Sequence, residues 1–169
     1  AFSHAQPTVD FNEMNPTGNA LVNPVDIANA GDGSGRLFIV EKRGTIRIIK
    51  DSAVLPDTFL DIRNLVMNSG ERGLLGMAFH PQYPDSRYVY VNYVKNGTII
   101  TTISRFTKDP NNPNKLLKSS EVIYITQAGE ETNHKAGDLA FGPDGYLYIT
   151  MGDGGGSYGP NDHAQDVTS

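Results

Sequence analysis

A strand–turn–strand unit occupies residues 138–149, which read DLAFGPDGYLYI. Its two apolar runs are rich in aromatic and β-branched residues, and the Gly-Pro-Asp-Gly between them is turn-forming. Two similar units precede it. Residues 25–40 run from VDIA through a glycine-rich turn to LFIV, and residues 76–91 run from GMAF through His-Pro to YVYV. The sequence therefore repeats one supersecondary unit three times.

The spacing of these units indicates the architecture. Their second strands begin at residues 37, 88 and 146, at intervals of 51 and 58 residues. Such intervals are typical of a propeller blade with a long loop, and a propeller carries about 4 to 8 blades. We therefore predict an all-β fold that forms the amino-terminal two to three blades of a larger β-propeller. A free-standing β-sandwich is the alternative.

Local signals support hairpins within these blades. Arg43-Gly44 separates apolar runs at residues 37–40 and 45–49, and Asn96-Gly97 follows the run at residues 88–94. Asn-Gly tolerates the positive φ angles of a tight hairpin turn. We expect the chain to return over residues 98–107 and to form another strand over residues 122–125.

Composition excludes several classes of protein. The 169 residues include 14 basic and 19 acidic side chains, a net charge of −5, and no cysteine. The scattered basic residues form no stripe for a phosphate backbone, so we do not expect a nucleic-acid partner. No apolar run approaches the roughly 18 residues of a spanning helix. The lack of cysteine excludes disulfides, thiolate zinc sites and thiol nucleophiles within the chain.

The amino terminus has two interpretations. Residues 1–6, AFSHAQ, fit either the remnant of a cleaved secretion signal or an ordinary frayed terminus. We assign residues 1–19 to an exposed amino-terminal segment and residues 20–169 to the propeller.

Two polar stretches are candidates for chemistry. His134 precedes the first strand of the third unit, where propeller loops gather at a channel mouth, and histidine is suited to remove a proton near neutral pH. Asp153 lies 19 residues later, at the far end of the same hairpin, so it could orient the imidazole. The alternatives are a loop histidine that caps a strand and a solvated aspartate in a glycine-rich turn.

Glu71 and Arg72 enter the second unit where His134 enters the third. If His134 faces the channel mouth, Glu71 or Arg72 is expected to face it too and to offer polar contacts to a bound ligand. The alternative is that the two residues form an exposed ion pair of little energetic value. The glycine-rich stretches at residues 31–35 and 152–156 lack the Gly-Lys-Ser/Thr of a phosphate-binding loop.

These motifs together resemble the soluble quinoprotein sugar dehydrogenases, the glucose/sorbosone dehydrogenase family. The resemblance runs from about residue 20 to the end and is carried by three segments, which read GERGLLGMAFHP at 70–81, NHKAGDLAFGPDGYLYI at 133–149 and GDGG at 152–155. It implies a six-bladed propeller that holds pyrroloquinoline quinone and Ca²⁺ and oxidises the anomeric carbon of aldoses to lactones.

The resemblance also implies roles for individual residues. His134 matches the catalytic base, which takes the proton of the sugar C1 hydroxyl while hydride passes to the quinone C5 carbon, and Asp153 matches its supporting aspartate. Glu71 falls at the position of a cofactor-contacting glutamine, and Asn133 at the position of an aspartate. We expect Glu71, Asn133 and Arg72 to contact the cofactor. Lys135-Ala136 replaces the Asn-Gly common in bacterial members.

In this family the cofactor clamps and the calcium-ligating carbonyls lie in later blades. We therefore expect the Ca²⁺ ligands outside this chain and no sugar oxidation by these 169 residues alone. The resemblance implies an aldose substrate, an external electron acceptor, and a secreted or periplasmic location. The second hypothesis is a non-catalytic propeller of the same family that binds a protein or carbohydrate. A metal-dependent lactone hydrolase is a weak third, because no acidic cluster converges at the blade entrances.

Overall fold

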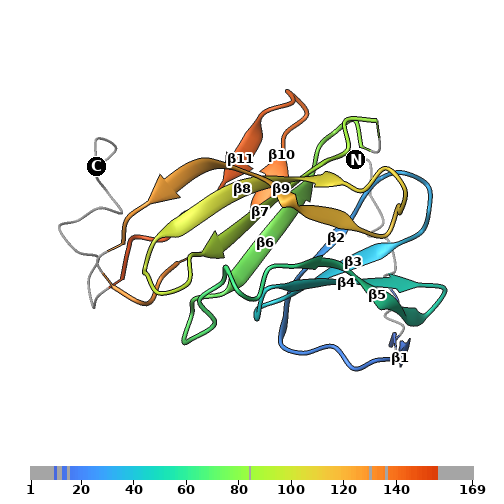
Figure 1. Ribbon diagram of the computed structural model, residues 1–169, viewed down its shortest axis with the longest axis horizontal. Helices are drawn as coiled ribbons and strands as arrows, with labels where there is room; N and C mark the ends of the chain where they lie inside the picture. Colours follow the sequence, from blue (N-terminus) through green and yellow to red (C-terminus); the bar gives the residue numbers. More distant parts are fainter. Residues whose placement is uncertain are drawn as a thin grey trace, which may run out of the picture.

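The computed structural model describes residues 10, 13–14, 16–83, 85–129, 131–135 and 137–155, and all its regular structure is β. The possible signal remnant at residues 1–6 lies outside these residues. The strands form a five-stranded sheet, a four-stranded sheet and a two-stranded sheet (Figure 1). None of the described residues belongs to a helix that could cross a membrane.

The first blade has the strand order β1-β5-β4-β3-β2, and β2 is its innermost strand. Its strands are β1 (Thr17–Gly18), β2 (Pro24–Asn29), β3 (Leu37–Glu41), β4 (Thr45–Lys50) and β5 (Ala53–Asp61).

The second blade is a four-stranded antiparallel meander in the order β6-β7-β8-β9. Its strands are β6 (Leu74–Phe79), β7 (Tyr88–Val94), β8 (Thr101–Lys108) and β9 (Leu116–Gln127). The third sheet contains β10 (Leu139–Phe141) and β11 (Leu147–Ile149). The innermost strands β2, β6 and β10 lie side by side, as expected for adjoining blades.

The structure confirms the predicted all-β propeller fragment. The second strands of the three units begin at residues 37, 88 and 147, against 37, 88 and 146 expected. The short strand β1 and the strand β5 were not predicted. Pro56 interrupts the pattern of β5, and the structure shows why it is tolerated. This strand lies at the outer side of the blade, next to the two-residue β1, where a missing N–H costs little.

The main core lies between the first two blades. Alternate residues of β7, Val89 and Val91, point into it, while Tyr90 packs toward the third sheet against Phe141. In the core between the first two blades, the ring of Phe79 in β6 packs against that of Phe38 in β3, with 4.7 Å between the ring centroids. Successive side chains of a strand point to opposite faces of the sheet, so one face of the second blade packs against the first blade and the other against the third sheet.

The second and third blades meet backbone to backbone. A Cβ atom added to Gly76 would lie 2.2 Å from the carbonyl oxygen of Gly137, and one added to Gly137 would lie 2.4 Å from Leu75 Cβ. Any side chain at either position would push β6 away from the segment that leads into β10. Glycine at residues 76 and 137 therefore sets the distance between these blades.

A buried ion pair links the first two blades. Asp32 and Arg36, whose side chains are 9% and 7% exposed, pair at 2.6 Å in the turn before β3. Arg36 Nη1 also donates to the Pro113 carbonyl at 2.7 Å and to Asn114 Oδ1 at 2.8 Å, in the loop between β8 and β9. Burial opposes ionisation of Asp32, but hydrogen bonds from Ser34 and Arg36 outweigh it and lower its pKa.

The glycine contact generates the first prediction. Gly76→Ala should lower the free energy of unfolding by at least about 3 kcal/mol, at the upper end for overpacking, because the neighbouring backbone cannot move aside. Gly97→Ala is the control. Its φ is +73° and nothing lies within 4 Å of the added Cβ, so only the left-handed strain of about 1–2 kcal/mol is expected. Urea denaturation measures both, and equal losses would contradict the contact argument.

The Asp32–Arg36 ion pair generates the second prediction. Arg36→Met leaves the Asp32 carboxylate buried without its cation, and breaking a buried pair costs about 3–5 kcal/mol of unfolding free energy. The double variant with Asp32→Asn should recover part of this loss in urea denaturation. Arg63→Met removes the exposed partner of Asp61 and should change stability little, because solvent screens that pair. A double variant no more stable than Arg36→Met would refute the coupling.

Candidate functional site

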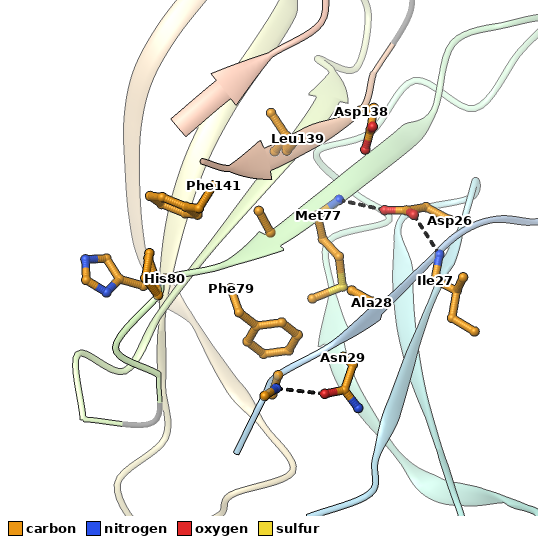
Figure 2. A pocket seen from close by; sticks show the side chains of 14 residues that line it. Asp26, Ile27, Ala28, Asn29, Met77, Phe79, His80, Asp138, Leu139 and Phe141 are labelled. Atoms are coloured by element: carbon orange, nitrogen blue, oxygen red, sulfur yellow. Dashed lines mark hydrogen bonds between the residues drawn. The ribbon is translucent and has the colours of Figure 1, made fainter. Parts of the chain in front are cut away.

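The three innermost strands line an open groove of about 330 Å³. Figure 2 shows Asp138 and Asp26 at one end and His80 at the other. Asp26 Oδ2 accepts the Met77 backbone N–H at 3.0 Å, which ties β2 to β6. The predicted site residues do not line this groove. Glu71, Arg72, Asn133 and His134 lie in the segments that enter β6 and β10, and Asp153 follows β11.

His134 lies in the segment that enters β10 and has a left-handed backbone. Its φ is +51°, uncommon for a residue other than glycine. The Glu71 carboxylate, from the segment entering β6, accepts the His134 backbone N–H at 2.5 Å. A Cβ atom added to Gly152 would lie only 1.6 Å from the His134 carbonyl oxygen, so a side chain at residue 152 would displace His134. Tertiary contacts on both sides hold the strained conformation.

Asp153 holds the imidazole. Its Oδ1 atom lies 2.8 Å from His134 Nδ1, and the side chains of His134 and Asp153 are 44% and 23% exposed. With Nδ1–H donating to the carboxylate, the lone pair lies on Nε2, on the exposed part of the ring. The pair therefore offers a proton acceptor on a partly exposed imidazole, the arrangement a general base requires.

The other predicted site residues gather around this pair. Asn133 packs against the turn after Asp153, since a Cβ atom added to Gly155 would lie 2.3 Å from Asn133 Oδ1. Arg72 is half-buried, and its Nε donates to the Ser69 carbonyl at 3.3 Å. Glu71 is engaged by the His134 backbone. The structure thus joins Glu71 at the entrance of the second blade to His134 at the entrance of the third. The roles of these residues, and the cofactor contacts of Glu71, Asn133 and Arg72, remain predictions.

Sequence reasoning missed Lys135, which was noted only as a replacement. Its side chain is buried, and its Nζ donates to the Ile99 carbonyl of the second blade at 3.3 Å. A lysine between a histidine and an alanine carries no sequence signal of burial, because the enclosing residues come from distant segments. Among the described residues, no three His, Cys, Asp or Glu side chains form a group that could hold a metal ion.

The Asp153 contacts generate a pH prediction. The Gly155 backbone N–H and, next, the His134 imidazole lower the pKa of Asp153 below its usual 3.8. The ionised form is thus favoured in the folded state. Its contribution to stability is fully present above pH 3.8 and is lost as pH falls through the lowered pKa.

We expect the carboxyl ¹³C titration of Asp153 to have its midpoint below 3.8. His134→Ala should raise this midpoint only part of the way, because the Gly155 N–H remains. Asp144 is an internal control, since its pKa is lowered by Tyr148 and Tyr146 instead and should not respond. A midpoint of Asp153 unchanged by His134→Ala would show that the pair does not persist in solution.

Comparison with known proteins places this geometry in a family. The sequence profile of the glucose/sorbosone dehydrogenases matches residues 21–169. The Hedgehog-interacting proteins of human and mouse are 36% identical over 149 residues, which cover 80% of this chain and 21% of theirs.

Two solved structures extend the comparison. An oxidoreductase of Thermus thermophilus, described as a glucose dehydrogenase, matches with a TM-score of 0.66 and 30% identity over 83% of this chain and 40% of its own. The PQQ-bound aldose sugar dehydrogenase of Streptomyces coelicolor matches with a TM-score of 0.68 and 26% identity over 85% of this chain and 41% of its own. The chain thus spans about a fifth of these curated relatives' length and two fifths of these structures. It belongs to the glucose/sorbosone dehydrogenase family.

Proposed function

We propose that this chain supplies the base-bearing part of a sugar dehydrogenase that uses pyrroloquinoline quinone and oxidises the anomeric carbon of aldoses to lactones. The observation that carries the proposal is the exposed His134 imidazole bound through Nδ1 to Asp153 at 2.8 Å. Family membership and the likeness to a PQQ-bound aldose sugar dehydrogenase support it.

The residues at the entrance fit an anionic quinone. Arg72 offers a guanidinium, which suits a carboxylate, beside the segment that carries His134. The quinone, when bound, supplies the hydride acceptor. Arg72, with the Asn133 amide, would hold it, and an external acceptor would later take the electrons.

Residues of this chain take up the proton that the sugar hydroxyl loses. His134 Nε2 takes the proton of the C1 hydroxyl as the C1 hydride leaves, so the sugar loses two electrons and two hydrogens and becomes the lactone. Asp153 keeps Nδ1 protonated, so that Nε2 is the free acceptor, and it stabilises the imidazolium that forms. Glu71 holds the backbone N–H of His134 and so restricts where the ring can lie.

The test uses the longest native chain that contains these residues. The calcium-loaded, quinone-free protein is titrated with pyrroloquinoline quinone, aldoses are added, and reduction is followed by quinone absorbance. His134→Ala should slow sugar-driven reduction by about 10²–10⁴-fold while quinone still binds, because only the base is lost. Asp153→Asn should slow it by up to about 10⁴-fold.

His80→Ala is the matched control. This histidine lies at the end of the groove opposite Asp138 and packs against Phe141 and Tyr88, so reduction should stay near the wild-type rate. Equal reduction by the His134→Ala variant and the wild type would remove His134 from the chemistry.

The second candidate is a propeller that binds another protein. Its support is the 36% identity to Hedgehog-interacting proteins. A protein that binds no quinone would favour this candidate, because the same blades can build a fold with either function.

A further inference from the structure

Lys135 is buried, although its neighbour in the sequence, His134, is exposed. Lys135 is 4% exposed, and its Nζ donates to the Ile99 carbonyl at 3.3 Å. A cavity of about 20 Å³ lies at this place, enough for about one water molecule. Its lining includes both residues and parts of the second and third blades: Thr101, Gln127, Gly129, His134, Lys135 and Gly152.

The surrounding backbone leaves room for this lysine only because it carries glycines. A Cβ atom added to Gly129 would lie 2.2 Å from Lys135 Nζ, and one added to Gly152 would lie 3.3 Å from the Lys135 backbone nitrogen. The lysine side chain thus occupies a specific space between the blades.

Stability does not account for an ammonium at this place. Burial lowers the pKa of Lys135, the nearby Arg72 lowers it further, and Glu131 acts in the opposite direction. The charged form is therefore disfavoured in the folded protein relative to water. Among the described residues, the hydrogen-bond partner of this ammonium is the neutral Ile99 carbonyl, which is a small return for that desolvation. We therefore expect an apolar side chain of similar length to suit the fold at least as well.

The contacts of Lys135 indicate a role in placing His134. The His134 backbone N–H donates to the Glu71 carboxylate, and the Lys135 side chain donates to the Ile99 carbonyl. Both Glu71 and Ile99 belong to the second blade. The imidazole is held by Asp153, at the end of the third-blade hairpin. The left-handed peptide of His134 is therefore fixed from the second blade on both sides, while its ring is fixed from the third.

We propose that Lys135 is a positioning residue for His134: its bond to the Ile99 carbonyl fixes the loop so that the imidazole keeps its contact with Asp153 and directs Nε2 outward. This inference rests on the proposed function of His134 as the base. It adds a residue that touches neither sugar nor quinone.

The test compares Lys135→Met, which keeps the length of the side chain but removes the charge and the donor, with the wild type. Lys50→Met is the matched control, because Lys50 is exposed at the end of β4 in the first blade. Three quantities are measured in the longest native chain: the melting temperature, the ¹⁵N shifts of the His134 ring without quinone, and the rate constant of sugar-driven quinone reduction at saturating sugar.

In Lys135→Met we expect an unchanged or higher melting temperature, because a desolvated charge is removed. The two ring ¹⁵N shifts of His134 should move toward each other as the tautomers mix. The rate constant should fall by about 10–100-fold, the effect of a small misplacement of a reacting group, with little change in sugar affinity. Lys50→Met should match the wild type in all three. Lys135→Gln, which keeps a donor, should lie between.

The outcomes separate the two proposals. His134 shifts in Lys135→Met identical to the wild type would overturn the positioning role. A lower melting temperature with unchanged shifts would also overturn it, by showing that the lysine serves only stability. A wild-type protein that reduces no quinone would contradict the proposed function, while the ¹⁵N shifts would still decide whether Lys135 positions His134.

Discussion

The distance between the second and third blades depends on contacts that only glycine permits. At residue 76 the carbonyl oxygen of Gly137 lies where an added Cβ would be, and at residue 137 the Cβ of Leu75 does. Within the third unit, Gly152 allows the same close approach of the His134 carbonyl. A blade has two apolar faces and must bury both, so it needs a neighbour on each side. The glycines set how closely the third sheet can approach, and this approach brings the entrance of β10 to the entrance of β6.

The candidate site is a product of that approach. Glu71 and Ile99 belong to the second blade, Asp153 to the third, and His134 lies between them. The backbone of the histidine is held by one blade and its ring by the other. Its left-handed φ would be unfavourable in an isolated loop, and the contacts from both blades maintain it. The geometry of the imidazole is therefore coupled to the packing of the blades.

The repeated strand–turn–strand units and the glycines build a propeller whatever the protein does, so they do not distinguish a dehydrogenase from a binding propeller. The features that favour chemistry are few and local. A partly exposed imidazole with a carboxylate bound to its Nδ1 atom has the form of a general base. A buried ammonium on the next residue is unfavourable for the fold alone, and this combination of a strained backbone and a desolvated charge is typical of functional sites.

The sequence alone determined the all-β class, the blade spacing and the Asn96-Gly97 hairpin, because alternation, turn residues and repeats are local signals. It also placed His134 and Asp153 at the two ends of one hairpin, while their roles remained open. It did not reveal β5, whose Pro56 is tolerated at the outer side of the blade where the β4–β5 register is irregular, nor the hydrogen bond between Glu71 and His134, 63 positions apart. The burial of Lys135 was equally hidden. Only the tertiary structure decided these features, because exposure and pairing depend on which distant backbones meet, and that is set where the blades pack.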